Sequence, residues 1–567
     1  YIASESVDLV YLDPPFNSNA TYNVLFAEQS GEKAASQIRA FEDTWTWDEE
    51  AARSYFETVQ AGGAVGNALE AFYTLLGDSN MMAYLAMMAP RLVELRRVLK
   101  PTGSIYLHCD PTASHYLKLL MDAVFGPVNF VAEVIWKRTS SHNDPKRPGR
   151  IHDTLLYYGR SSARIWNPTY QPLDTGYVEK VYTYEDERGR YRLDNLTAPG
   201  VSKGVTGEVW RGVDPTARGR HWRTTPQELE RLLADGRIQL KKDGRPSLNG
   251  YKQYLADSKG MSLQSIWADI PNVTGISNEK LGYPTQKPEA LLERIILSSS
   301  NEGDVVLDPF CGCGTAVVVA HLLKRRWVGI DITHLAVNLM KYRLLNRVGE
   351  SVTAEYDVVG EPTDVEGARQ LAHDDPYQFQ LWALGLVGAR PTELKKGADK
   401  GIDGRAVFFE RGPTDTKHII LSVKAGTHIG RHFVHELRGV VDREKAAIGV
   451  LITMEPPTKP MREEAASAGF YTSPWGAHPR LQLLTVAELL DGRRIDSPPL
   501  GQVGQTFKKA PRAAAAKRRT PSCLWGGERC PVPSGAARGR PHERRPPHGR
   551  SCLRTASELV QGKEGSA

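Results

Sequence analysis

Strand and helix patterns alternate in two stretches of this chain, and the stretch between them lacks that alternation. In the first stretch, residues 1–159, the patterns predict strands at Val7–Leu12 and Ser104–Cys109 and helices at Met81–Leu99 and Ser114–Phe125. In the second, from Pro288, they predict helices to Ser299 and at Ala316–Leu323 and strands at Val305–Leu307 and Trp327–Ile330. Such alternation predicts an α/β fold with helices covering a mostly parallel sheet.

Composition sets the broad limits. With 567 residues the chain is too long for one core, so we expect several domains. The hydrophobic share of 41% is ordinary, and no run of about 18 apolar residues could span a bilayer. Six cysteines without a disulfide-scaffold pattern predict a cytoplasmic protein. The net charge of +6 permits a DNA partner without requiring one. The start in a strand-like run at Tyr1, without Met, is typical of a truncated front.

The remaining segments differ in texture. Residues 160–281 are aromatic, Gly-rich and basic, which predicts a partly irregular insert, and 282–360 complete the first α/β domain. Glu361–Asp375 has the composition of a linker. A second α/β domain is predicted at 376–497, with strands at Ala406–Glu410, Ile419–Lys424 and Gly449–Thr453 and a helix at Met461–Ala468. Residues 498–567 are rich in Arg, Pro, Ala and Gly, and we expect a disordered tail there.

The first chemical motif directly follows the first predicted strand, and its residues are Asp13, Pro14, Pro15 and Phe16. An exocyclic amine of a nucleic-acid base is a poor nucleophile because its lone pair is delocalised into the ring. The Asp13 carboxylate and the Pro14 carbonyl could accept its N–H bonds and concentrate the lone pair on nitrogen. The prolines stiffen the loop, and Phe16 offers a face for stacking a base taken out of a duplex. A plain strand-terminating turn is the alternative for this motif in isolation.

The second motif, Asp308–Thr315, follows the strand Val305–Leu307 and opens a helix. Gly312 and Gly314 permit close approach of a ligand to the backbone, and helix N-terminal amides can bind a carboxylate. Asp331 ends the next strand, where an acid can accept hydrogen bonds from ribose hydroxyls. This arrangement is typical of a cofactor-binding turn. Cys311 and Cys313 lack the further ligands of a zinc site, so we expect no metal here.

Together these motifs resemble the DNA amino-methyltransferases of the β arrangement, in which the Asp-Pro-Pro-Phe segment precedes the glycine motif. The N6-adenine enzymes similar to type III modification subunits are the nearest in pattern. The resemblance covers roughly residues 1–350. Further segments that carry it are Asn17–Asn19, Tyr22–Phe26, Phe41–Trp45, Leu99–Ser104 and Tyr283–Pro288.

The resemblance implies a Rossmann-like fold, S-adenosylmethionine as the methyl donor, and base flipping in duplex DNA. Asp13, Pro14, Pro15 and Phe16 would be catalytic. The residues expected to bind the cofactor are Thr285, Gln286, Lys287, Pro288, Asp308, Pro309, Phe310, Gly312, Gly314, Thr315 and Asp331. Asp as the first motif residue favours adenine, whereas cytosine-N4 enzymes more often carry Ser. An N4-cytosine enzyme and an inactive DNA-binding relative remain alternatives.

The insert occupies the place of a target-recognition region in this family. Its Arg and aromatic side chains suit phosphate contact and base-edge readout, and the candidate DNA-binding residues are Arg211, His221, Trp222 and Arg223. A basic insert packed by its aromatics is the alternative for each residue. A restriction subunit or a second copy of the chain is an expected protein partner.

The second domain resembles restriction-endonuclease-like domains of the PD-(D/E)xK superfamily, particularly the Mrr-like branch. Asp403 would hold Mg²⁺, and Lys424, on the strand Ile419–Lys424, would stabilise charge or orient water. Ser422 stands where the superfamily places Glu, Asp or Gln, which departs from a complete metal site. Binding of DNA or a partner without cleavage is the alternative function.

Overall fold

The computed structural model describes residues 2–15, 45–141, 144, 146–274, 277, 279, 281, 285–392, 401–409, 416–426, 428–498 and 551–555, the last as backbone only. The described residues fall into two compact units. One unit consists of Pro168–Gln264, and the other contains the remaining described residues. None of the described helices combines the length and apolarity needed to cross a membrane.

A large sheet organises the first unit, with the strand order β13-β3-β4-β2-β1-β14-β15-β24-β16. Its strands are β1 Val7–Leu12, β2 Leu99–Cys109, β3 Phe130–Lys137, β4 His152–Gly159, β13 Ile266–Trp267, β14 Val305–Asp308, β15 Arg326–Asp331, β16 Tyr356–Val359 and β24 Ser551–Thr555. Every neighbouring pair is parallel except those made by β4. The expected mostly parallel α/β sheet is confirmed.

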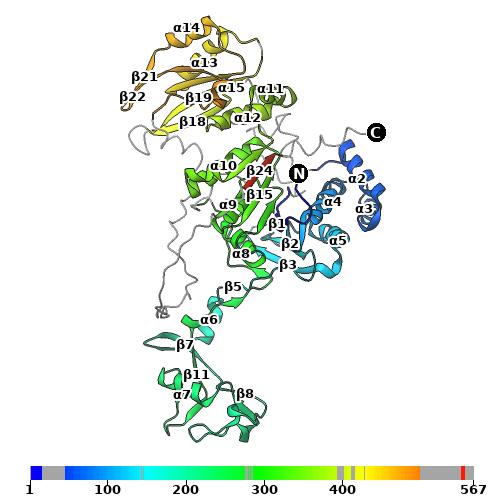
Figure 1. The fold of residues 1–567 in the computed structure, drawn as a ribbon, viewed down its shortest axis with the longest axis vertical. Helices are drawn as coiled ribbons and strands as arrows, with labels where there is room; N and C mark the ends of the chain where they lie inside the picture. Colours follow the sequence, from blue (N-terminus) through cyan, green and yellow to red (C-terminus); the bar gives the residue numbers. More distant parts are fainter. Residues whose placement is uncertain are drawn as a thin grey trace, which may run out of the picture. The chain divides into compact units, whose positions relative to one another are not determined.

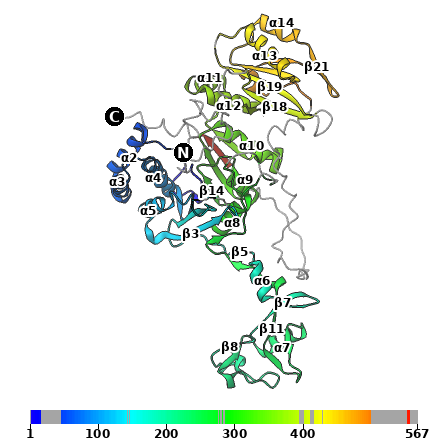
Figure 2. The ribbon, with the colours of Figure 1, turned by 180° about the vertical axis from the view of Figure 1, so that it is seen from behind.

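Helices cover both faces of this sheet (Figures 1 and 2). They are α2 Glu49–Ala61, α3 Gly63–Leu76, α4 Asn80–Val98, α5 Ser114–Phe125, α8 Glu289–Ser299, α9 Thr315–Leu322 and α10 His334–Val348. Alternate residues of β2 face the two layers, because side chains alternate along a strand. Ile105 and Leu107 pack in the core with α4 and α5, whereas Tyr106 Oη bonds Ser299 Oγ of α8 at 2.8 Å.

The strand directions fix where the sequence motifs meet. Leu9 pairs with Val306 and Val10 with Leu307, so β1 and β14 lie side by side and run the same way. Strands β2, β3 and β15 share that direction. The carboxyl ends of all five strands therefore lie at one edge of the sheet, where α/β proteins bind ligands.

The second unit has its own small core. It holds the sheet β10-β11-β7-β6 and a core around Trp210, Trp222 and Leu229. The insert was predicted at 160–281, but the compact part is narrower, since β13 already pairs with β3 of the large sheet. Its elements are β5 Tyr170–Gln171, α6 Thr175–Val181, β6 Tyr184–Asp186, β7 Gly189–Asp194, β8 Thr197–Pro199, β9 Arg220–Trp222, α7 Pro226–Ala234, β10 Ile238–Leu240, β11 Pro246–Tyr254 and β12 Met261–Ser262.

The chain after β16 forms a five-stranded sheet, β17-β18-β19-β20-β23, with a core on each face. Ile419 and Leu421 of β19 face one core, and Ile420 between them faces the other. The elements are α11 Val365–Asp374, α12 Pro376–Leu386, β17 Arg390–Pro391, β18 Gly404–Phe409, β19 Thr416–Lys424, α13 Arg431–Arg443, β20 Ile448–Thr453, α14 Lys459–Ser467, β21 Phe470–Ser473, β22 Gly476–Pro479, β23 Leu481–Thr485 and α15 Val486–Leu490.

Two segments differ from their prediction. Most of the expected linker Glu361–Asp375 is helix α11, because Asp364 caps its first turn through Gly367 N and Ala368 is buried in the core. Within the tail expected to be disordered, Ser551–Thr555 pair as β24 between β15 and β16. Strand pairing uses backbone groups that every residue but proline carries, so composition does not exclude it. The rest of the tail, from residue 499, lies outside the described residues.

A buried carboxylate joins three strands of the large sheet. Asp8 of β1 accepts hydrogen bonds from Lys100 Nζ at 2.8 Å to both oxygens and from Val305 N at 2.9 Å. Its side chain is only 3% exposed. Asp8 therefore ties β1 to β2 and to β14, which lies far away in the sequence.

We expect Asp8→Ala to lower the free energy of unfolding by about 1–3 kcal/mol, because it leaves a backbone donor and an amine without their partner. Urea unfolding measures this loss. The control is Glu302→Ala, whose ion pair with Lys324 joins side chains that are 65% and 74% exposed. That change should stay within about 0.5 kcal/mol. Equal losses in the two variants would contradict a special role for Asp8.

Candidate active site

The loop after β1 carries the acid of the first motif. Asp13 forms an ion pair through Oδ2 with Lys287 Nζ, and the two side chains are 15% and 11% exposed. Its other oxygen, Oδ1, is buried and has no hydrogen-bond partner among the described residues. Pro14 is buried and Pro15 is exposed, and Phe16 lies outside the described residues. Asp13 is thus held by one oxygen and presents the other as a buried acceptor.

The glycine turn after β14 is shaped by its close neighbours. Gly312 and Gly314 have φ angles of 49° and 73°, which favour glycine. A Cβ at Gly314 would collide with Met340 of α10. The turn is further held by Asp331, whose Oδ2 accepts from Gly312 N at 2.9 Å. The two glycines are therefore required by local geometry, and the helix α9 begins at Thr315 directly after them.

Asp331 also closes its own loop, since Oδ1 accepts from Thr333 N at 3.0 Å and from Thr333 Oγ1 at 2.9 Å. A carboxylate offers about four lone-pair sites, and the backbone of Ile332 adds a further contact to these three donors. Asp331 therefore orders the glycine turn and its own loop. Its assignment as a cofactor residue stays a prediction.

The segment 285–288 runs along the same edge. The Gln286 side chain forms hydrogen bonds within its own loop. It accepts from Leu281 N at 2.8 Å and donates to the Glu279 carbonyl at 2.6 Å. Thr315 Oγ1 donates to the Lys287 carbonyl at 3.3 Å. This bond joins the glycine turn to the lysine that holds Asp13. Thr285 is exposed and Pro288 is buried, whereas Tyr283 and Pro284 lie outside the described residues.

Arg343 of α10 supports the glycine turn through hydrogen bonds. This role was not predicted from the sequence. Its side chain is fully buried. Its Nη1 donates to Thr315 Oγ1 at 2.8 Å and to the Cys313 carbonyl at 3.2 Å, and Nη2 pairs with Glu289 at 3.1 Å. The spacing of about 30 residues gives no local signal for this contact.

A buried series of hydrogen-bonded side chains supports β1. Tyr11 Oη lies 2.9 Å from His108 Nδ1, and His108 Nε2 lies 3.2 Å from Asp153 Oδ2. All three side chains are buried. Burial raises the pKa of Tyr11 well above its usual value, and the nearby Asp13 raises it further. Tyr11 therefore stays neutral and acts as a fixed hydrogen-bonding support two residues from Asp13.

Three acidic side chains, Asp13, Asp308 and Asp331, lie at this edge of the large sheet, which we call the acidic edge. Burial raises the pKa of Asp308 well above its ordinary value, and the charges of Asp13 and Asp331 raise it further. Burial also raises the pKa of Asp331. Carboxylates that are costly to ionise together favour a cation between them. The site is therefore suited to a positively charged ligand beside Oδ1 of Asp13.

Comparison with known proteins agrees with this geometry. Residues 7–341, more than half of the chain, match the family described as DNA methylase. The chain belongs to this DNA methylase family. Residues 375–491 match a second family, described as restriction endonuclease. Both resemblances predicted from the sequence are confirmed.

Three relatives illustrate the likeness. The type II methyltransferase M.EcaI of Enterobacter cloacae is 34% identical over 275 residues, which is 48% of this chain and 60% of that protein. The Mod subunit of the type III restriction-modification enzyme StyLTI of Salmonella typhimurium is 29% identical over 55% of this chain and 46% of its own length. The DNA adenine methyltransferase YhdJ of Escherichia coli is 48% identical over 14% of this chain and 27% of its own length. The chain thus spans less than two thirds of each relative.

The position of Trp222 in the insert differs from the one predicted for a DNA contact. Trp222 is fully buried in the core of the second unit, and its indole donates to the Glu208 carbonyl at 2.8 Å. It therefore packs the insert and does not reach a ligand. Arg211 and Arg223 are at the surface, paired with Glu230 and Asp194, and His221 Nδ1 lies 2.9 Å from the Gly200 carbonyl. Their role in DNA binding stays a prediction.

The candidate nuclease residues meet at the end of β19. Asp403 Oδ2 accepts from Ser422 Oγ at 3.0 Å and from Val423 N at 2.6 Å, and it lies 3.9 Å from Lys424 Nζ. Gln380 of α12 reaches Asp403 Oδ1 at 3.2 Å, a contact that the sequence analysis missed. The described residues contain no group of three or more His, Cys, Asp or Glu side chains placed to hold a metal. Ser422, Lys424 and Gln380 add no second carboxylate to Asp403, so these four described residues by themselves do not make a complete Mg²⁺ site.

We expect Asp308→Asn to stabilise the ligand-free chain at neutral and higher pH. The native pKa of Asp308 is raised above its unfolded value, so the native state binds more protons. Stability is consequently lost as pH rises from the unfolded pKa through the raised native pKa. Asn cannot ionise but can still accept from Phe310 N, as Asp308 does at 3.1 Å.

Melting curves at pH 5 and pH 8 test this difference. The variant should melt at least a few degrees above the parent chain at pH 8, since about 1 kcal/mol moves the melting temperature by roughly 2–4 °C in a domain of 150–250 residues. The gap should narrow at pH 5. A variant that is less stable at both pH values would show that the Asp308 charge is compensated.

Proposed function

We propose that this chain transfers a methyl group from S-adenosylmethionine to the exocyclic amino nitrogen of a base in duplex DNA, at N6 of a flipped-out adenine. The observation that carries the proposal is Asp13. Its Oδ1 is a buried acceptor without a partner among the described residues, beside the glycine turn and acidic edge. A buried charged acceptor left unsatisfied is costly, so its presence points to a ligand that donates to it.

Each residue then has a distinct task. Asp13 Oδ1 accepts one N–H of the base amine, and the Pro14 carbonyl is assigned the second. Lys287 holds Asp13 by its other oxygen and offsets part of its charge. When bound, S-adenosylmethionine supplies an electrophilic methyl group on a sulfonium centre. The groups that would hold it are Asp308, Asp331 and the backbone amides of the glycine turn. The two carboxyl groups suit its positive charge.

Two observations favour adenine over cytosine. The motif begins with Asp13, the form usual in the N6-adenine enzymes that the chain resembles. The relative YhdJ, whose name states adenine as its target, is 48% identical over the part that it shares with this chain. The N4-cytosine enzymes remain the alternative, because both amines would use the same two acceptors.

The decisive variant is Asp13→Ala, which removes the acceptor. We expect its kcat to fall about 100- to 1,000-fold, the usual cost of deleting one transition-state hydrogen-bond partner, while S-adenosylmethionine still binds. The assay uses labelled S-adenosylmethionine, duplex DNA and separation of the methylated nucleosides. The same DNA sequenced for modified bases returns the recognition site.

The matched control is Glu94→Gln, which removes a surface carboxylate that is 63% exposed and pairs with Arg97. This variant should keep full activity. Label recovered on cytosine would replace the adenine assignment with the N4 alternative. Binding of DNA without methylation by the parent chain would instead identify an inactive relative.

The C-terminal domain supports a second candidate function, cleavage of DNA. The observation that favours it is the convergence of Asp403, Lys424 and Gln380 at the end of β19. A methylase and a nuclease in one chain would act together in restriction and modification, and the type III Mod relative belongs to such a system. A restriction subunit is therefore the protein partner that we propose to test first.

We expect any nicking of supercoiled plasmid in Mg²⁺ to fall about 100-fold in Asp403→Ala and in Lys424→Ala, since each removes a charge from the cluster. The control is Asp442→Ala, whose exposed carboxylate pairs with Arg480 in the same domain. Nicking that persists in both cluster variants would remove these residues from the site. A parent chain that binds but does not nick would leave DNA binding as the role of the domain.

A further inference from the structure

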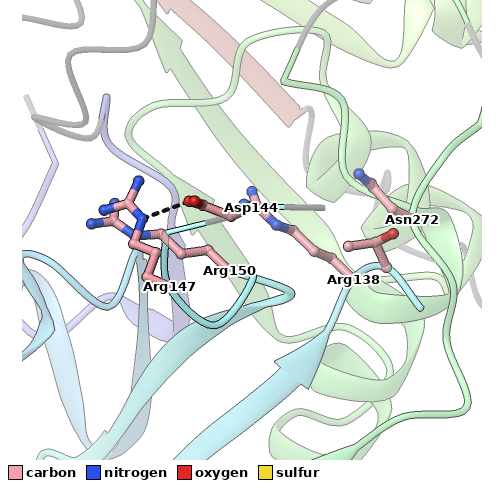
Figure 3. Close-up of a pocket in the computed structure, with 6 residues that line it drawn as sticks. Arg138, Asp144, Arg147, Arg150 and Asn272 are labelled. Carbon is pink, nitrogen blue, oxygen red and sulfur yellow. Dashed lines mark hydrogen bonds and ion pairs between the residues drawn. The ribbon is translucent and has the colours of Figure 1, made fainter. Parts of the chain in front are cut away.

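A pocket of about 310 Å³ opens beside the loop that joins β3 to β4. Its lining holds three arginines, Arg138, Arg147 and Arg150, and a single carboxylate, Asp144. Thr139 and Asn272 complete the lining. Figure 3 shows the arginine side chains extending toward the space around Asp144. Arg138 also pairs with the buried Asp153 behind the lining, so the three guanidinium groups exceed the two carboxylates by one positive charge, which favours an anionic ligand.

Each of the three arginines contacts a polar neighbour. Arg147 Nε donates to Asp144 Oδ2 at 2.7 Å, and Arg150 Nη1 donates to Thr112 Oγ1 at 3.3 Å. Arg138 Nη1 lies 3.3 Å from Asp153 Oδ1. The loop itself is closed by Arg138 N donating to the Ile151 carbonyl at 3.0 Å, and Asn272 N donates to the Arg138 carbonyl at 3.1 Å. These contacts reduce the side-chain freedom that binding would otherwise have to restrict.

The pocket is connected to the catalytic strand. Arg138 follows the last residue of β3, whose carboxyl end lies at the same edge of the sheet as Asp13. Asp153, the ion-pair partner of Arg138, is buried and bonds His108, which in turn bonds Tyr11. A continuous set of polar contacts therefore runs from the pocket to the strand that ends before Asp13.

We infer that this pocket binds one backbone phosphate of the DNA strand that carries the target base. The inference rests on the proposed function, because duplex DNA is the anionic substrate at this edge. Guanidinium groups match phosphate oxygens in pairs, and phosphate contacts fix the register of a protein on DNA. A phosphate held here while Asp13 receives the base would keep the backbone of the flipped nucleotide in a fixed position. Asn272 supplies an uncharged donor to the same anion.

The test compares Arg147→Gln and Arg150→Gln, singly and together, with the control Lys146→Gln. Lys146 is an exposed cation in the same loop that does not line the pocket. Affinity for a fluorescent duplex is measured between about 50 and 200 mM salt, where each lost phosphate contact lowers the slope of log affinity against log salt by about 1. We expect a slope change and about tenfold weaker binding in each arginine variant, a larger loss in the double variant, and no change in Lys146→Gln.

Three results would overturn the inference. Equal changes in Lys146→Gln would mean a diffuse basic surface without a specific pocket. Unchanged slopes in the double variant, with S-adenosylmethionine binding retained as proof of folding, would exclude a DNA phosphate. Inorganic phosphate that binds the parent chain but not the double variant, with unchanged DNA slopes, would assign the pocket to a free anion. Because the readout is DNA binding, a chain that methylates nothing would refute the proposed function without deciding this inference.

Discussion

The parallel pairing of β1 with β14 is the interaction on which the site depends. It joins the two α/β stretches of the sequence into one sheet and sets Asp13 beside the glycine turn. Asp13 and Lys287 are separated by 274 positions in the sequence, yet they form an ion pair. Asp8 reinforces the same junction, since it bonds β2 and β14 from β1. Asp13 and the glycine turn stay side by side only while this junction holds.

The junction concentrates negative charge, and the fold bears a cost for it. Burial raises the pKa of Asp308, the charges of Asp13 and Asp331 raise it further, and the charge of Lys287 offsets only part of this rise. Buried charges of this kind are kept where a ligand compensates them. A cation bound at this edge would recover part of the stability that the ligand-free chain is expected to lose. The acidic edge and the arginine pocket at the end of β3 thus suit opposite charges, a cation near the glycine turn and a phosphate near the loop after β3.

The sequence predicted those parts whose signal is local. The strands Val7–Leu12 and Val305–Leu307, the glycine turn and the helix at Ser114–Phe125 all depend on neighbouring residues, and each was found within one or two positions. Arg343, Gln380 and Asp153 were missed because their partners lie far away in the sequence. Trp222 was assigned wrongly because an aromatic among arginines suits a small core as well as a DNA surface. The helix α11 was missed because Pro362 and the acidic residues near its start are typical of a linker, although Ala368 is buried in the core.

The insert interrupts the chain at a place where it does not disturb the central strands of the large sheet. The chain departs after β4 and returns at β13, which pairs with β3 at the end of the strand order. An edge strand has one row of backbone groups without a neighbour, so adding β13 there disturbs no existing pair. The central strands β1, β14 and β15, which carry Asp13, Asp308 and Asp331, keep their register. A change in the insert can therefore leave the strands that carry Asp13 and the glycine turn in their register.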